Sequence, residues 1–469
     1  MALQSFFKKY IGDRNFYKSV LAISVPIMIQ NGITNFVSLL DNIMVGQIST
    51  EAMSGVSIVN QFIFIFNLII FGAISASGIF TSQFYGKGDV EGVRHTFRFK
   101  FVINFFACLL GILIFIFFDD ALINLFLHDE KQLNLLSTLN FGKSYLFIML
   151  FGLLPYSVSQ VYASTMRETG DTVTPMLSSI IAVATNCILN AILIFGLLGF
   201  PALGVEGAAI ATVISRFVEL FILLFKTHLN NKKYPFIIGA YRSLKIPKNL
   251  AKQIIIKGFP LILNEFLWAL AMIMRNQCYS TRGLDVVAAQ NISSTLFNFF
   301  NLVYISLGNA TAIIVGSYLG AGKLDEAYDY SNKLLAFSVI ATTLVSIIFV
   351  ACAFFFPFIY NTSNEVRQLA IIMMIISSVT MPFCAYANAA YFSMRSGGKV
   401  AVTFIFDSGF MWCVVMPLSF ILSYLTNINI IPLFIICQST EIIKAFFGAV
   451  LYGKKTWLKS LVNDNSLTK

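Results

Sequence analysis

The sequence is poor in charge, since Asp, Glu, Lys and Arg make up 12% of its 469 residues, about half of the roughly 25% typical of soluble domains. Histidine occurs three times, and the seven cysteines include no CxxC pair, which disfavours a zinc or redox centre. HExxH, GxSxG and complete phosphate-loop motifs are missing, so neither hydrolase chemistry nor an ATP-driven pump is indicated. We expect no enzyme and no organic cofactor.

Long apolar runs are abundant instead. Hydrophobic residues make up 57% of the chain, and its mean hydropathy is +0.79. A helix needs about 20 apolar residues to cross a bilayer. A β-barrel would alternate in polarity along each strand, whereas the run 105–118 is apolar throughout. We therefore predict an all-α polytopic membrane protein with twelve transmembrane helices, near 17–40, 52–81, 97–119, 136–160, 172–197, 203–226, 254–279, 286–315, 334–358, 368–393, 400–423 and 430–452.

The net charge of +10 comes from Lys and Arg residues that lie mostly in the loops on one side of the membrane. If both termini are cytoplasmic, most Lys and Arg residues fall inside, including the basic run 226–257, while the outer loops hold only Lys131, Arg282 and Arg367. Such an asymmetry fixes an even number of spans by the positive-inside rule. We predict a multi-pass protein of the bacterial inner (cell) membrane with both termini in the cytoplasm. Its partners are the lipids of the bilayer, and we expect no nucleic-acid partner.

The two halves of the chain resemble each other at an offset of 234 residues. Equivalent pairs are Pro26 and Pro260, Phe66-Asn67-Leu68 and Phe300-Asn301-Leu302, Gly86 and Gly320, and, at an offset of 228, Met166-Arg167 and Met394-Arg395. Six spans in each half give a parallel repeat about an axis along the membrane normal. We predict two six-helix lobes related by pseudo-two-fold symmetry: an N-lobe (1–228), a basic cytoplasmic linker (229–252) and a C-lobe (253–469).

Two carboxylates belong to predicted spans, Asp41 toward the outer end of the first and Glu265 in the middle of the seventh. An ionised group there costs about 2.5–3.5 kcal/mol even on the lenient insertion scale. A carboxylate in such a setting can exchange a proton or attract a cation. Asp41 could also simply bond to a neighbouring helix, but a neutral residue would do so at lower cost, so we favour a functional role.

Three neutral polar side chains accompany Asp41 as candidates. Asn186 and Asn190 are spaced i, i+4 and share a helix face, and Thr212 lies in the next span. With Asp41 they form a set that would hold Na⁺ or a protonated carboxyl. Asparagines in membrane helices also serve as interhelical contacts, and the spacing alone does not decide between the two.

The remaining charges within spans have structural interpretations. Arg216 with Glu219, and Glu441 with Lys444, are i, i+3 neighbours, which predicts two internally neutralised pairs. Asp407 lies seven residues into a span that starts in the cytoplasm, and we give it a structural role.

These residues make the chain resemble the multidrug and toxic compound extrusion (MATE) family over essentially its full length. The resemblance rests on LLDNIMVGQIS around Asp41, on MRETGDTVTP after the fourth span, on Asn186, Asn190 and Thr212, and on PLILNEFLWALAM around Glu265. It implies two lobes that alternate between inward- and outward-open states. It also implies a coupling-ion site for H⁺ or Na⁺ at Asp41, Asn186, Asn190 and Thr212, and a C-lobe carboxylate at Glu265. Cys384 stands where some branches carry an aspartate.

The resulting expectation is a monomeric cation-coupled antiporter, driven by H⁺ or Na⁺, that exports small lipophilic organic cations such as drugs or toxic metabolites. The alternative is a lipid-linked precursor flippase of the same superfamily. Flippases tend to carry extra spans and a strongly cationic cavity, whereas the buried charges here are mainly acidic or paired. A third class, a membrane enzyme or receptor, is disfavoured by the repeat. The chemistry is not duplicated, because Asp41 falls on Arg275 and Asn31 on Glu265, so we place the coupling site in the N-lobe.

Overall fold

The computed structural model describes residues 10–124 and 132–463. It is 86% helix, and no strand occurs in the described ranges, which confirms the predicted all-α class. Lys131, predicted in an outer loop, lies outside these ranges.

Twelve helical segments within the described residues are long and apolar enough to cross a membrane, as predicted. Those of the first half are α2 (Arg14–Gly46), α3 (Thr50–Lys87), α4 (Val90–Phe117), α6 (Gln132–Glu168), α7 (Val173–Phe195) and α8 (Gly204–Leu229), with a short α5 (Asp119–Asn124) between α4 and α6. Those of the second half are α9 (Lys248–Ser280), α10 (Leu284–Phe300) continued by α11 (Leu302–Gly320), α12 (Leu324–Ala353), α13 (Asn364–Ser396), α14 (Val400–Phe404) continued to α15 (Met416–Tyr424), and α16 (Ile430–Gly453).

Local sequence signals set several helix ends. Asp89 caps α4 by accepting the backbone N–H of Gly92 at 2.8 Å, and Ser363 caps α13 by accepting that of Val366 at 3.3 Å. Such caps satisfy N–H groups that have no partner within the helix. At the other end of α7, Gly196 adopts a left-handed φ of 71°, the usual helix-ending conformation for glycine.

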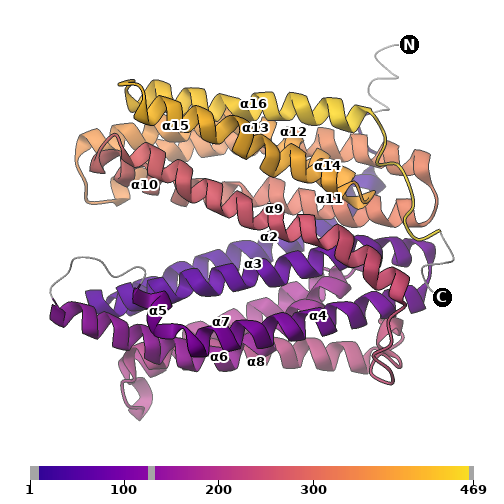
Figure 1. The fold of residues 1–469 in the computed structure, drawn as a ribbon, viewed down its shortest axis with the longest axis horizontal. Coiled ribbons are helices and arrows are strands. Elements are labelled where there is room, and N and C mark those ends of the chain that lie inside the picture. Colours follow the sequence, from indigo (N-terminus) through magenta and orange to yellow (C-terminus); the bar gives the residue numbers. More distant parts are fainter. Residues whose placement is uncertain (1–9, 125–131, 464–469) are drawn as a thin grey trace. The chain divides into compact units, whose positions relative to one another are not determined.

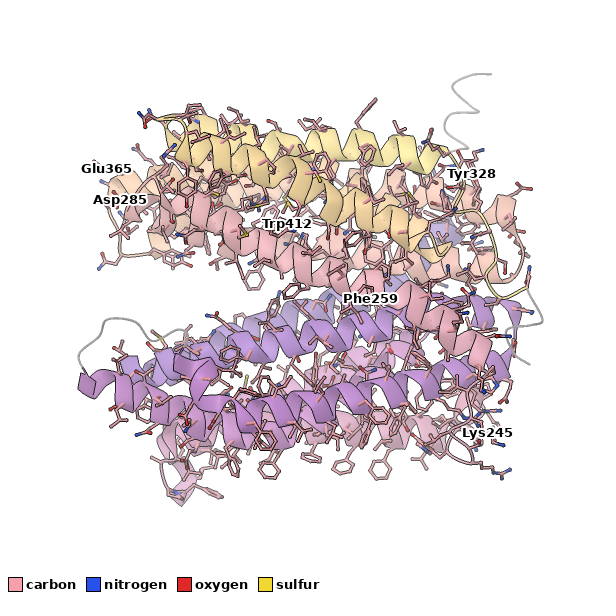
Figure 2. All side chains as sticks on the ribbon, in the orientation of Figure 1. Lys245, Phe259, Asp285, Tyr328, Glu365 and Trp412 are labelled. Carbon is pink, nitrogen blue, oxygen red and sulfur yellow. The ribbon has the colours of Figure 1, made fainter. Side chains whose placement is uncertain are left out.

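The eleventh span departs from regular α-helix. Between α14 and α15 the chain forms two π-helical segments, Ile405–Gly409 and Met411–Val415. π-Turns are rare, and they occur frequently at functional sites. The indole N–H of Trp412, which is labelled in Figure 2, donates to the carbonyl of Leu267 in α9 at 3.0 Å. This contact anchors the irregular span on α9.

The chain forms two compact units. Among the described residues, the N-terminal unit comprises those of Ile29–Thr81 and Asp89–Ile254, and the C-terminal unit comprises 10–28, Ser82–Gly88 and 255–463. In the first, α8 packs on both α6 and α7; in the second, α13 packs on α12 and α16 (Figure 1). Each unit has its own buried apolar core. Helix α2 belongs to both units, and the division falls after Met28, two residues beyond Pro26. A proline inside a helix removes one backbone hydrogen bond and favours a kink at that point.

One close helix contact in the C-terminal unit reflects the internal repeat. A Cβ atom added to Gly86 of α3 would lie 1.9 Å from the Ser317 carbonyl oxygen, and one added to Gly320 of α11 would lie 1.9 Å from that of Gln83. At an offset of 234, Gly86 is equivalent to Gly320 and Gln83 to Ser317. The contact is therefore self-complementary, as two-fold-related surfaces are, in agreement with the predicted pseudo-two-fold symmetry.

Replacing Gly86 with Val should destabilise the fold, because the side chain cannot occupy the space held by the Ser317 carbonyl. We expect a loss of about 1–3 kcal/mol or more, measured as a lower thermal unfolding temperature in detergent and a lower yield. Gly453→Ala is the control, since no atom lies within 4 Å of an added Cβ there. Equal melting of Gly86→Val and the unmodified protein would contradict the packing.

Candidate ion-coupling site

The four predicted N-lobe residues come together in the N-terminal unit. The side-chain amide of Asn190 donates to a carboxylate oxygen of Asp41 at 2.5 Å and to Oδ1 of Asn186 at 3.2 Å. The Asn186 amide in turn donates to the Thr212 hydroxyl oxygen at 3.2 Å. Helices α2, α7 and α8 thus each contribute to one connected polar cluster, which we call the Asp41 cluster (Asp41, Asn186, Asn190 and Thr212).

The Asp41 cluster has an unused acceptor. Oδ1 of Asn190 is buried and has no hydrogen-bond partner in the described structure, and Asn190 itself is 1% exposed. A buried polar atom without a partner is costly. Beside it lie one carboxylate and two further neutral oxygens, those of Asn186 and Thr212. A hard cation or a protonated Asp41 carboxyl would complete this set, because either supplies the positive charge or the donor that Asn190 Oδ1 lacks.

A second polar chain runs through the same unit and was not predicted. Arg167 of α6 donates to Gln30 of α2 at 3.2 Å, Gln30 donates to the Ser179 hydroxyl of α7 at 2.7 Å, and Ser179 donates to the Glu219 carboxylate of α8 at 2.6 Å. We call it the Gln30 chain. Ser179 lies seven residues before Asn186, and Glu219 seven after Thr212. On α7 and α8 the Gln30 chain and the Asp41 cluster therefore lie on the same helix faces, about 10 Å apart along each of these two axes.

Arg216 and Glu219, predicted as an ion pair, act on each other through their charges but make no direct contact. Glu219 takes its hydrogen bond from Ser179, while the Arg216 guanidinium lies 5.1 Å from the centre of the Tyr156 ring. Its Nη1 atom is buried without a hydrogen-bond partner in the described residues. An i, i+3 spacing permits a pair, but here both side chains reach neighbouring helices instead.

Lys100 of α4 and Glu168 of α6 form a buried ion pair in this unit. The Lys100 side chain is fully buried and that of Glu168 is 13% exposed. The ammonium also donates to the hydroxyls of Ser164 and Thr165, both at 3.2 Å. Each of its three donors is thus engaged, as a buried ammonium requires. The sequence identified Lys100 only as one of the cytoplasmic basic residues.

Asp171, in the turn between α6 and α7, ties the basic linker to the helices. Its carboxylate accepts hydrogen bonds from the backbone N–H of Thr174 at 3.1 Å, from Lys233 at 2.6 Å and from the Tyr234 hydroxyl at 2.5 Å. Nearby, Arg98 of α4 donates to the carbonyls of Gly239 and Ala240. The linker is therefore packed on the N-terminal unit.

Replacing Asp171 with Asn should destabilise the protein at neutral pH. Burial alone would raise the pKa of Asp171, but the hydrogen bonds from Lys233, Tyr234 and Thr174 lower it to about 2. A folded-state pKa below the unfolded one stabilises the protein above the unfolded value, and that gain disappears as the pH falls toward the folded value. The side chain is only 9% exposed, so we expect a difference of about 2 kcal/mol at pH 7.

Thermal unfolding of the two proteins across the pH range tests this. The difference should shrink as the pH is lowered from about 5 toward about 2. Asp285→Asn, at an exposed carboxylate in the first turn of α10 (labelled in Figure 2), is the matched control and should have little effect. A difference between Asp171→Asn and the unmodified protein that is independent of pH would contradict the ionic basis of this contact.

The C-terminal unit holds the second predicted carboxylate, Glu265. It lies half-buried in the middle of α9, and the charged groups that act on it are Arg395 and Asp407. Asp407 accepts hydrogen bonds from Lys444 of α16 at 2.6 Å and from Asn264 of α9 at 2.9 Å. The predicted direct contact of Glu441 with Lys444 is wrong, since Lys444 forms its ion pair with Asp407 on another helix, and Glu441 acts on Lys444 only through its charge.

Comparison with known proteins agrees with this architecture. The family model MatE matches residues 26–192 and 260–445. A probable multidrug resistance protein NorM of Thermotoga maritima is 24% identical over 98% of this chain and 97% of its own. A probable multidrug resistance protein YoeA of Bacillus subtilis is 24% identical over 89% of each chain. A crystal structure of a Vibrio cholerae MATE transporter superposes with a TM-score of 0.84 at 18% identity, covering 97% of this chain and 99% of that one.

The match extends over both repeats, the twelve spans and nearly the whole length of the relatives. The chain is a multi-pass membrane transporter that belongs to the MatE (multidrug and toxic compound extrusion) family.

Proposed function

We propose that this protein exports lipophilic organic cations in exchange for H⁺ or Na⁺, with Asp41 as the coupling group. The observation that carries the proposal is the Asp41 cluster, in which one carboxylate lies beside a buried oxygen of Asn190 that has no partner in the described structure. A single negative charge in that setting attracts either a coupling ion or a cationic substrate. Holding both at once would place two positive charges on one carboxylate.

Exchange follows from this competition. With Asp41 ionised, the cytoplasm-facing state accepts an organic cation. Binding of H⁺ or Na⁺ from outside then neutralises the Asp41 carboxylate, and the organic cation is released. Helix α2 contributes residues to both compact units and contains Pro26, so it is suited to transmit the change by bending. Affinities that differ by a few kcal/mol between the two states are sufficient. Glu265 adds a second negative charge, in α9, that favours cationic substrates.

The chemical class of the substrate is proposed from three features. The relatives in Thermotoga maritima and Bacillus subtilis are named probable multidrug resistance proteins, which indicates small molecules. The carboxylates Asp41 and Glu265 favour positive charge. The chain also contains 48 Phe, 18 Tyr and 15 Met residues, side chains that adapt to flat apolar cations by stacking and soft contact.

The proposed setting is the bacterial inner membrane, with a monomer whose termini are both cytoplasmic. The supporting observation is the asymmetry of the basic residues. Arg98 lies toward the helix end on the side of the linker and Lys233 lies in the linker itself, and most Lys and Arg residues lie on that side. Arg282 and Arg367 lie at the helix ends away from the linker. The positive-inside rule places the basic side in the cytoplasm.

Purified protein in proteoliposomes tests the proposal. Ethidium or tetraphenylphosphonium movement is measured with a pH gradient, with a Na⁺ gradient, and with neither. We expect one of the two gradients to drive transport against the substrate gradient. Transport that proceeds equally without any ion gradient would rule out ion coupling, and no movement of either cation under any gradient would rule out the substrate class.

A further inference from the structure

The C-terminal unit contains a counterpart of the Gln30 chain. Asn264 is equivalent to Gln30 at the offset of 234, and Asp407 to Ser179 at the offset of 228. The side-chain amide of Gln30 donates to Ser179 at 2.7 Å, and that of Asn264 donates to Asp407 at 2.9 Å. The same contact between the first and fifth spans of a repeat is thus made twice.

The third member of each chain is also equivalent. The loop between α15 and α16 spans 425–429, three residues fewer than the loop 196–203 between α7 and α8, which lowers the offset in the last span to 225. Glu219 then falls on Lys444, and both bond the side chain on the preceding span at 2.6 Å. A carboxylate in the first repeat is replaced by an ammonium in the second.

The reversal of charge extends beyond this pair. Arg216 falls on Glu441 at the same offset of 225, and Asp41 falls on Arg275 at the offset of 234. Three ionisable positions of the first repeat therefore carry the opposite sign in the second. Lys444 and Arg275 of the C-terminal unit thus stand where the N-terminal unit has the carboxylates Glu219 and Asp41.

We propose that Lys444 is a tethered cation that occupies the cation-binding position of Asp407, so that the second repeat takes up no coupling ion at that carboxylate. The inference rests on the proposed function only in assigning coupling to Asp41. Lys444 and Asp407 are 14% and 19% exposed, and their contact distance is 2.6 Å. In such a setting a carboxylate needs a counter-charge, and an ammonium carried on α16 supplies it permanently.

The surroundings of Asp407 would suit Na⁺ if the ammonium were removed. The amide nitrogen of Asn264 donates to the Asp407 carboxylate at 2.9 Å, and Oδ1 of the same amide accepts a hydrogen bond from the Ser408 hydroxyl at 2.7 Å. Asn264 Oδ1 and the Ser408 hydroxyl are both neutral oxygens of the kind that hard cations bind. The π-helical segment Ile405–Gly409 carries both Asp407 and Ser408. It therefore presents two adjacent oxygen-bearing side chains to α9, where Asn264 is 2% exposed.

The experiment replaces Lys444 with Met in an Asp41→Asn background, which removes any Na⁺ response of the N-terminal unit. Thermal unfolding of the full-length protein in detergent is compared in NaCl and in choline chloride at equal ionic strength. We expect Na⁺ to raise the unfolding temperature of Asp41→Asn/Lys444→Met by on the order of 1–2 °C, and to have no such effect on Asp41→Asn alone. This readout needs no transport, so its failure is distinct from a failure of the proposed antiport.

Adding Asp407→Asn to the double variant is the matched control, because it removes both charges of the pair, and it should abolish the Na⁺ response. Lys444→Gln provides a second neutral replacement that can still hydrogen-bond Asp407 if the Met variant does not fold. The same absence of a Na⁺ effect with and without Lys444 would overturn the proposal. So would an Asp407-dependent Na⁺ effect while Lys444 is present.

Discussion

Cells that express the Asp41→Asn variant should lose resistance to cationic drugs and fall to the level of cells without the transporter, while the amount of protein in the membrane stays the same. The change removes the only charge of the Asp41 cluster but keeps a side chain of the same shape next to Asn190. An amide neither exchanges a proton nor balances a cation, so no coupling ion can compete with the substrate. The measurement is ethidium efflux from loaded cells together with the drug concentration that stops growth.

Asp120→Asn is the matched control for this experiment. Asp120 lies in α5, where its carboxylate is 60% exposed and pairs with Lys143 at 2.6 Å. Exposed pairs contribute about 0–1 kcal/mol, so this acid can be removed without affecting the ion exchange. We expect efflux close to that of the unmodified protein. Full efflux by Asp41→Asn, at equal protein levels, would show that Asp41 is not the coupling group.

Replacing Lys100 with Met should unfold or strongly destabilise the protein, by about 3–5 kcal/mol. Lys100 is fully buried against Glu168, so the variant leaves a carboxylate that is 13% exposed without its counter-charge. The double variant Lys100→Met/Glu168→Gln removes both charges and should recover much of the loss, because paired charges are often replaceable by neutral groups while single ones are not. Thermal unfolding in detergent and membrane yield measure both effects.

An exposed pair calibrates this result. Lys323 and Glu326 are 56% and 50% exposed and lie 3.1 Å apart, so Lys323→Met should change stability by less than about 1 kcal/mol. If Lys100→Met proved as mild as Lys323→Met, the buried ion pair would not be important for the fold. If the double variant were no more stable than Lys100→Met, the loss would come from packing and not from the unpaired charge.

The sequence was sufficient to predict the twelve spans, the repeat and the members of the Asp41 cluster. Spans follow from the length of apolar runs, which the bilayer imposes directly. The cluster follows because Asn186 and Asn190 occupy one face of α7, a property of helix geometry alone. Asp41 was identified by the cost of a carboxylate inside a span and Thr212 as a neutral oxygen in the next span, and the resemblance to the MATE family then implied that they share one site with the two asparagines.

Partners on different helices were not predictable in this way. Lys444 could reach Glu441 on its own helix, but it binds Asp407 on another span. The choice depends on how α16 packs against the π-helical segments 405–409 and 411–415, and an apolar sequence contains no signal for those segments. Gln30 and Ser179 were overlooked because neutral polar residues are common in membrane helices, and their bond at 2.7 Å joins residues 149 positions apart.

Competition for Asp41 is the central claim, and substrate binding to the purified protein tests it most directly. Tetraphenylphosphonium affinity is measured in detergent as the pH is lowered and, separately, as Na⁺ is raised at constant ionic strength. We predict that one of the two ions weakens binding about tenfold or more, a coupling within the usual range, and that this dependence is lost in Asp41→Asn. Affinity that responds to neither ion, or a response that persists in Asp41→Asn, would contradict the account.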